Sequence, residues 1–390
     1  MAVSVRKWMK AIFFALTAYT LVTILSHSFY GKHKRSRGLS PRQHLLFVKT
    51  HKTGSSTVVN LFQRHAYANG LAVALPKDDD MFLGWPRLLT NRENIVLNLD
   101  NGSMKFNYVI NHLIYRELLI APLFSSEPTR VTLVRHPTEQ CRSSFHYYEI
   151  LKDQHDNTTS VVKQMERFFS NPARFDSSYQ IRDAFVKSHT KNPQLADLGL
   201  AYQDMDRNDA VERHVQMILN NFNLVMVADM MEESCLLLKR LMRWSLKDII
   251  FSKKNVFDYP GKADAIPKEV LVAMGEWNWG DNLLYWKAKE VLFKQMGDEP
   301  LFQEELLHFK QINTLVLDYC SQPALSKSKE LVIEATKWNE EFTIGNDYCS
   351  DLLRKERPFT RLLQSKQRPD MFNHAYYTSI EDPLYLRLEY

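Results

Sequence analysis

Short apolar runs followed by helical patterns recur along the chain. The runs lie at residues 44–48, 108–111, 131–134 and 224–228, and the first precedes a helix-like pattern at residues 58–67. Repeated strand–helix units of this kind are typical of a parallel sheet covered by helices. The pattern therefore predicts an α/β fold with a central parallel sheet flanked by helices.

Helical periodicity dominates the carboxyl-terminal part of the chain. It is clearest at residues 282–296 and 301–319, and a candidate strand lies at residues 249–251. A tail rich in aromatic residues and prolines follows from Gln364 to Tyr390. Because no polar linker separates these segments from the rest, we expect them to pack on the sheet.

The amino-terminal segment is long and apolar. Residues 11–31 contain no Asp, Glu, Lys or Arg, and as a helix they can cross a hydrocarbon core of ~30 Å. A cleaved signal peptide is the alternative, but its apolar core usually has only ~7–15 residues. Sequons at Asn101 and Asn157 favour glycosylation of a lumenal body. The predicted segments are a cytosolic tail (1–10), a transmembrane signal anchor (11–30), a stem (31–43) and a lumenal domain (44–390).

The basic charge of the chain belongs to its first 42 residues. The 390 residues include 50 Lys and Arg against 45 Asp and Glu, a formal net charge of +5. Eight of the basic residues and none of the acidic ones lie in the first 42, which leaves 42 basic against 45 acidic residues in the body. A nucleic-acid-binding face is therefore not indicated. The 45% hydrophobic content excludes a disordered or fibrous chain.

Four cysteines stand far apart without any C-x-x-C spacing, which disfavours a zinc knuckle. In a lumenal body, Cys320 and Cys349 are the pair that we expect to form a disulfide, since the segment between them closes a modest loop. Buried free thiols are the equally weighted alternative.

An anion-binding loop is predicted between the first strand and its helix. Its sequence is Lys52-Thr53-Gly54-Ser55-Ser56-Thr57. Small residues let backbone N–H groups approach a phosphate, hydroxyls add donors, and a helix N-terminus favours negative charge. The loop lacks the G-x-x-x-x-G-K order of a P-loop kinase. An ordinary Ser/Thr-rich helix start is the alternative interpretation.

A second anion-binding element follows the strand at residues 131–134. Arg135 stands at the end of that strand, Pro137 suits the first turn of a helix, and Ser143 lies about two turns further on. The guanidinium and the hydroxyl can converge on one anion. Two such sites on adjacent units imply a ligand with two separated phosphates.

The two motifs resemble the phosphosulfate-binding motifs of the sulfotransferases, which use 3′-phosphoadenylyl sulfate (PAPS). Segments 47–53, 225–243 and 281–292 are similar to the Golgi galactose 3-O-sulfotransferases. The resemblance covers roughly residues 44–350. It implies a P-loop-like sulfotransferase fold in a single-pass type II Golgi membrane protein. The implied reaction is sulfuryl transfer from PAPS to the 3-hydroxyl of a terminal β-galactose on glycoprotein or glycolipid glycans, with no metal ion; a homodimer is left open.

The resemblance also implies roles for the motif residues. The segment Thr53–Thr57 would hold the 5′-phosphosulfate, and Lys52 would neutralise the charge that grows on the bridging oxygen. Arg135 and Ser143 would hold the 3′-phosphate, which distinguishes this donor from ATP.

The acceptor hydroxyl must lose a proton, and histidine is suited to accept it. His112 directly follows the strand at residues 108–110, so it would lie at the carboxyl edge of the sheet. Its context resembles the glycan 2-O-sulfotransferases, in which a histidine at the corresponding strand end is the base. His51, beside Lys52, is the alternative.

Weaker candidates have plainer structural explanations. They are Lys253, Lys254 and Asn255 for the 3′-phosphate or adenine, Trp277 and Trp279 for stacking on a sugar, and Asp78, Asp79 and Asp80 for sugar hydroxyls. A solvated basic turn explains the first group at least as well, core packing is the commoner role of tryptophan, and the aspartates usually form a solvated acidic run. A glycosaminoglycan 2-O-sulfotransferase and, more remotely, a membrane-anchored lectin are the alternative functions. The slightly acidic body favours a neutral acceptor.

Overall fold

The computed structural model describes residues 40–77, 81–90, 95–96, 105–151, 160–178, 180–254, 264–322 and 330–369. The chain divides into a unit of residues 1–41 and a body of residues 42–390, and the body is described below. The predicted anchor at residues 11–30, the sequons at Asn101 and Asn157, the acidic run at residues 78–80 and Asn255 lie outside the described residues. Within the described ranges, no helix has both the length and the apolar character that a bilayer crossing requires.

Five parallel strands form the central sheet. They are β1 (Leu45–Val48), β2 (Val73–Ala74), β3 (Tyr108–Val109), β4 (Thr129–Val134) and β5 (Leu224–Val227), in the order β2-β3-β1-β4-β5. The side chains of β1 are at most 1% exposed, as expected for a strand covered on both faces. The predicted parallel sheet is confirmed, and β2 is an additional short strand.

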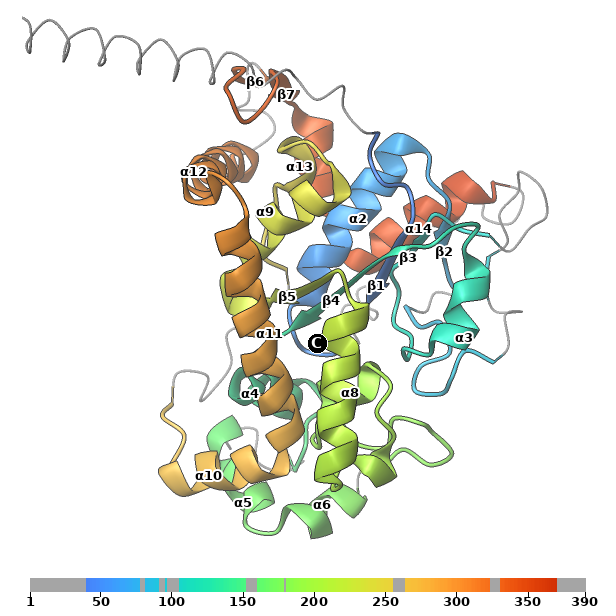
Figure 1. Ribbon diagram of the computed structural model, residues 1–390, viewed down its shortest axis with the longest axis vertical. Helices are drawn as coiled ribbons and strands as arrows, with labels where there is room; N and C mark the ends of the chain where they lie inside the picture. The colour runs from blue at the N-terminus through green and yellow to red at the C-terminus, as the bar shows by residue number, and fades with distance from the viewer. Residues whose placement is uncertain are drawn as a thin grey trace, which may run out of the picture. The chain divides into compact units, whose positions relative to one another are not determined.

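Helices surround this sheet (Figure 1). They are α2 (Ser55–Asn69), α3 (Glu117–Ile120), α4 (Pro137–Tyr147), α5 (Val161–Phe169), α6 (Pro172–Ser178), α7 (Pro193–Asp197), α8 (Asn208–Asn221), α9 (Met231–Met242), α10 (Lys268–Trp277), α11 (Trp279–Asp298), α12 (Phe302–Ser321), α13 (Asn346–Leu353) and α14 (Glu356–Gln367). In the view of Figure 1, α2 and α13 lie above the strands, and α4, α8 and α10 lie below them. Helices α9 and α11 pack on β5, and α14 packs on α2. A separate antiparallel pair, β6 (Leu331–Ile333) and β7 (Phe342–Ile344), follows α12.

The predicted strand at residues 249–251 is wrong. Residues Lys247–Ile249 form a 3₁₀ turn. The Phe251 N–H donates to the Asn313 side chain at 2.9 Å, so this backbone is satisfied by α12 and not by a neighbouring strand.

The beginning of the predicted tail is helical, because Gln364–Gln367 forms the last turn of α14. The side-chain amide of Gln367 bonds both backbone groups of Val73, accepting from its N–H at 2.7 Å and donating to its carbonyl at 3.0 Å. Helix α14 therefore covers the edge of β2, which an open sheet would leave unpaired. The expected packing of the carboxyl-terminal helices on the sheet is confirmed for α11, which packs on β5, whereas α12 packs on α9; residues 370–390 of the tail lie outside the described residues.

The expected disulfide between Cys320 and Cys349 is also confirmed, and it joins the end of α12 to α13. Cys141 and Cys235 are buried free thiols.

Candidate functional site

The segments that leave β1, β3 and β4 meet at the carboxyl edge of the sheet. His51 and Lys52 follow β1, His112 follows β3, and Arg135 follows β4. The carboxyl ends of parallel strands are where open α/β sheets build their sites. The ring centroids of His51 and His112 lie only 3.8 Å apart, and an Arg135 guanidinium N–H donates to the Lys52 carbonyl at 3.2 Å. The structure thus brings His51, Lys52 and His112 together with Arg135, which the sequence analysis also selected.

His51 is held by a buried carboxylate that sequence reasoning missed. Its Nδ1 lies 3.0 and 2.9 Å from the two carboxylate oxygens of Asp197, and its backbone N–H donates to the same group at 2.7 Å. Trp85 Nε1 also donates to Asp197, at 3.0 Å. Because a carboxylate only accepts, the Nδ1 N–H donates to Asp197, and in the neutral ring Nε2 therefore carries the lone pair. His51 Nε2 is buried and has no hydrogen-bond partner.

The ring of His51 contacts two other aromatic rings, stacked with His112 and tilted against Trp85. His112 packs against it at 3.8 Å, and Trp85 packs against it at 4.2 Å. His112 Nδ1 donates to the Lys49 carbonyl at 3.1 Å. Burial, followed by the electrostatic influence of the neighbouring His51 and Lys49, holds the pKa of His112 well below its usual range. His112 is therefore neutral at physiological pH.

The short helix α7 connects His51 to Arg135. Its Asp197 binds His51, and its Gln194 pairs with the Arg135 backbone, accepting from the N–H at 2.8 Å and donating to the carbonyl at 2.9 Å. The buried Asp281 of α11 accepts the backbone N–H groups of Gln194 and Leu195 at 3.0 and 2.9 Å. These N–H groups belong to the first turn of α7, where no intrahelical partner is available.

The loop Lys52–Thr57 leads from β1 into α2. Gly54 precedes α2 with φ of 85°, a left-handed conformation that favours glycine, and no side chain caps the helix. The hydroxyls of Thr53 and Ser55 donate to the Thr50 carbonyl at 3.1 and 2.9 Å. The Ser56 hydroxyl donates to Glu356 at 2.7 Å. These three hydroxyls donate to protein acceptors, and the Thr57 backbone N–H donates to the Gly54 carbonyl at 3.1 Å.

Lys52 is the first residue of this loop and has two cationic neighbours, Lys49 and Arg135. Its ammonium lies 3.5 Å from the centroid of the Tyr147 ring. Burial, followed by the charges of Lys49 and Arg135, lowers the pKa of Lys52 to about 7. A lysine with this pKa is ready both to pair with an anion and to give up a proton near neutral pH.

The remaining sequence candidates occupy varied positions. Ser143 is half-buried on α4. The Lys254 backbone N–H donates to Thr57 Oγ1 at 2.9 Å, which places this turn against α2, whereas Lys253 is exposed. The Lys191 ammonium lies over the Trp277 ring, 4.5 Å from its centroid. Trp279 packs on the main hydrophobic core. Neither tryptophan lines the pocket beside His51.

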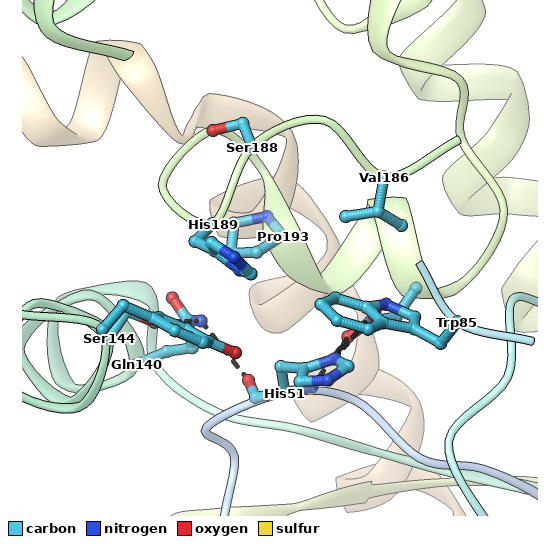
Figure 2. A pocket seen from close by; sticks show the side chains of 10 residues that line it. His51, Trp85, Gln140, Ser144, Val186, Ser188, His189 and Pro193 are labelled. Atoms are coloured by element: carbon cyan, nitrogen blue, oxygen red, sulfur yellow. Dashed lines mark hydrogen bonds and ion pairs between the residues drawn. The ribbon is translucent and has the colours of Figure 1, made fainter. Parts of the chain in front are cut away.

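That pocket is a small hollow, partly open to solvent, between the β1 loop, α4 and the segment before α7 (Figure 2). It is lined by His51, Trp85, Gln140, Ser144, Tyr148, Val186, Ser188, His189, Pro193 and Asp197. In Figure 2 the rings of His51, Trp85 and His189 surround the same space. Burial, with a smaller contribution from His51, lowers the pKa of His189 to about 3, so this ring is also neutral.

In the part of the chain that the structure describes, no cluster of three or more His, Cys, Asp or Glu side chains could hold a metal ion.

Comparison with known proteins identifies relatives of the chain. The sequence model of the family described as Galactose-3-O-sulfotransferase matches residues 13–325. Galactose-3-O-sulfotransferase 2 of Mus musculus is 30% identical over 217 residues, which are 55% of this chain and 53% of the relative. Galactosylceramide sulfotransferase of Bos taurus is 29% identical over 252 residues, 64% of this chain and 56% of the relative. Galactose-3-O-sulfotransferase 3 of Homo sapiens is 28% identical over 243 residues, 61% and 54% respectively. The matched region thus spans a little over half the length of these relatives.

We predict that the Lys52 ammonium titrates near pH 7, because burial and two neighbouring cations disfavour its charge. The measurement is nuclear magnetic resonance of lysine side chains labelled at Cε, with Lys52→Arg to assign the signal. Lys49→Met should move the transition to higher pH, since one of the neighbouring charges is removed. A Lys52 transition above pH 9 in the unmodified chain would contradict this account.

Proposed function

Because the chain belongs to the galactose 3-O-sulfotransferase family, we propose that it transfers a sulfuryl group from PAPS to the 3-hydroxyl of a terminal β-galactose. The mechanism rests on one observation: His51 Nδ1 is hydrogen-bonded to Asp197, and the buried His51 Nε2 has no hydrogen-bond partner. This imidazole lies beside Lys52 and the start of α2, so a proton acceptor and an anion-binding helix terminus share one edge of the sheet.

The start of α2 would hold the 5′-phosphosulfate of the donor. The first turn of the helix contains no acidic residue, and its N-cap is a glycine without a side chain. Helix N-termini of this kind bind phosphates through backbone N–H groups and the helix dipole. We assign this contact to the loop Thr53–Thr57, chiefly to its backbone. Arg135, with Ser143 on α4, would hold the 3′-phosphate through a charged fork and a hydroxyl.

The reaction is an in-line displacement at sulfur. His51 Nε2 accepts the proton of the galactose 3-hydroxyl as the new oxygen–sulfur bond forms. The bond between sulfur and the bridging oxygen breaks, and its electron pair stays on that oxygen, which becomes part of the product adenosine 3′,5′-bisphosphate. Lys52 neutralises this charge and can supply a proton, since its pKa is lowered to about 7. Positioning and charge stabilisation supply most of the catalysis, as in phosphoryl transfer.

We propose His51 as the base and keep His112 as the alternative. A catalytic base works best with a pKa near the working pH, and the pKa of His112 lies well below its usual range. His112 instead packs its ring on His51 at 3.8 Å and holds the plane of that ring.

The hollow beside His51 would receive the galactose ring. Trp85 lies 4.2 Å from His51 and offers an aromatic face to the apolar side of a pyranose, while Gln140 and Ser144 supply polar groups.

We further propose that the catalytic domain is lumenal in the Golgi, behind a signal anchor at residues 11–30, with Asn101 and Asn157 glycosylated. The disulfide between Cys320 and Cys349 supports an oxidising compartment. The homodimer stays a prediction.

The function is tested by radiosulfate transfer from labelled PAPS to free β-galactosides, 3-O-methyl β-galactosides and desulfated heparan. We expect the full-length chain to label free galactosides, to leave the 3-O-methyl compounds unlabelled, and to lose transfer in Lys52→Ala even at saturating donor. Label on heparan alone would replace this proposal with a glycosaminoglycan 2-O-sulfotransferase.

The base assignment is tested with His51→Ala and Asp197→Asn. We expect each to lower kcat by about 10²–10⁴-fold, because the first removes the proton acceptor and the second its orienting carboxylate. Binding of adenosine 3′,5′-bisphosphate, measured by calorimetry, should stay close to that of the unmodified chain.

A matched control is His65→Ala, which removes a buried histidine that stacks on Trp244 at 4.2 Å, away from the pocket. It should lower stability and leave kcat of the folded protein unchanged. If His112→Ala abolishes turnover while His51→Ala does not, His112 is the base.

The donor contact is tested by comparing Gly54→Ala with Gly70→Ala. Both glycines have a left-handed backbone, with φ of 85° and 63°, and an added Cβ meets nothing within 4 Å at either position. Each substitution should therefore lower the free energy of unfolding by about 1–2 kcal/mol. Only Gly54→Ala should also weaken binding of adenosine 3′,5′-bisphosphate; equal affinities in the two variants would argue against the loop as the donor site.

A further inference from the structure

One polar face of the donor helix α2 is bound by the carboxyl-terminal segment of the chain. Ser56, Asn60 and Gln63 are spaced four and three residues apart and so share a helix face. Ser56 Oγ donates to the Glu356 carboxylate at 2.7 Å, Asn60 Nδ2 donates to the Asp351 carbonyl at 3.0 Å, and Gln63 Nε2 donates to the Glu356 carbonyl at 3.3 Å. All three acceptors belong to α13 and α14.

The same Glu356 forms a buried ion pair with Lys49, the residue that directly follows β1. Lys49 Nζ lies 2.5 Å from Glu356 Oε1, and the two side chains are only 2% and 5% exposed. The Lys49 carbonyl in turn accepts the hydrogen bond from His112 Nδ1. One carboxylate thus connects Lys49, which precedes the loop Lys52–Thr57, to Ser56, which lies near the end of this loop in the first turn of α2.

This arrangement constrains the loop from both of its ends. Each oxygen of Glu356 has its own partner, so the carboxylate cannot turn without losing a charged hydrogen bond. Leaving Lys49 buried and unpaired is strongly unfavourable. The disulfide between Cys320 and Cys349 fastens α13 to α12, so the segment that carries Glu356 is itself held in place.

We propose that Glu356 is a positioning residue of the donor site: through Lys49 and Ser56 it fixes the start of α2 at the geometry that binds the phosphosulfate. The inference rests on the proposed function. It gives α14 a part in donor binding. This helix lies beyond residues 13–325, which match the family. It also means that the Ser56 hydroxyl acts on the donor through Glu356 and not by direct contact.

The test is a mutant cycle on the full chain with Ser56→Ala, Glu356→Gln and the double variant. The readout is the dissociation constant of adenosine 3′,5′-bisphosphate by calorimetry, together with KM for PAPS and kcat. We expect each single variant to weaken donor binding by about tenfold, the loss expected for a charged hydrogen bond. The double variant should bind no more weakly than Glu356→Gln alone, and kcat at saturating donor should stay close to that of the unmodified chain.

A matched control separates positioning from general stability. Glu305 on α12 is another buried carboxylate, and its two partners, Lys239 at 2.7 Å and Arg240 at 2.5 Å, are cations on α9. Glu305→Gln should lower the melting temperature without changing the affinity for adenosine 3′,5′-bisphosphate. If Glu356→Gln fails to fold, Ser56→Ala still tests the inference, because it leaves the ion pair with Lys49 intact.

Two results would overturn the inference alone: unchanged donor affinity in folded Glu356→Gln or Ser56→Ala, or single-variant effects that multiply in the double variant. Failure of the unmodified chain to bind adenosine 3′,5′-bisphosphate would instead overturn the proposed function, and this inference with it.

Discussion

The site depends on the contacts made by the five-residue helix α7. Asp197 of this helix holds His51, and Gln194 pairs with both backbone groups of Arg135. The ends of β1 and β4 are thereby fixed relative to each other by one rigid element. Helix α7 is in turn held by Asp281, whose carboxylate accepts two of its first N–H groups. Burial raises the pKa of Asp281 to about 7 in spite of these bonds.

The close approach of α11 to α7 explains why glycine precedes Asp281. A Cβ at Gly280 would lie 2.8 Å from a methyl group of Leu195 and 3.0 Å from one of Val211. Without a side chain at this position, α11 comes close enough for the Asp281 carboxylate to reach the start of α7. The packing of α11 against α7 thus determines the position of His51, which belongs to neither helix.

The pattern of apolar and polar residues predicted those parts of the site that are formed by residues close together in the sequence. The strand, loop and helix around Gly54 follow from an apolar run, a glycine and small residues in sequence order, and His112 and Arg135 follow from their places at strand ends. Asp197 could not be found this way, because it is 146 residues from His51 and belongs to no motif. Glu356 is 300 residues from Ser56 and lies in an ordinary amphipathic helix. The two-residue strand β2 is too short to leave a pattern, and residues 249–251 are apolar because they are buried, not because they pair in the sheet.

The most direct test of this account is a crystal structure of the chain with adenosine 3′,5′-bisphosphate and a β-galactoside bound together. The account predicts the 5′-phosphate at the backbone N–H groups that begin α2, the 3′-phosphate at Arg135, and the galactose 3-hydroxyl within hydrogen-bonding distance of His51 Nε2. A galactose 3-hydroxyl that faces another side chain, or a nucleotide bound away from α2, would contradict it.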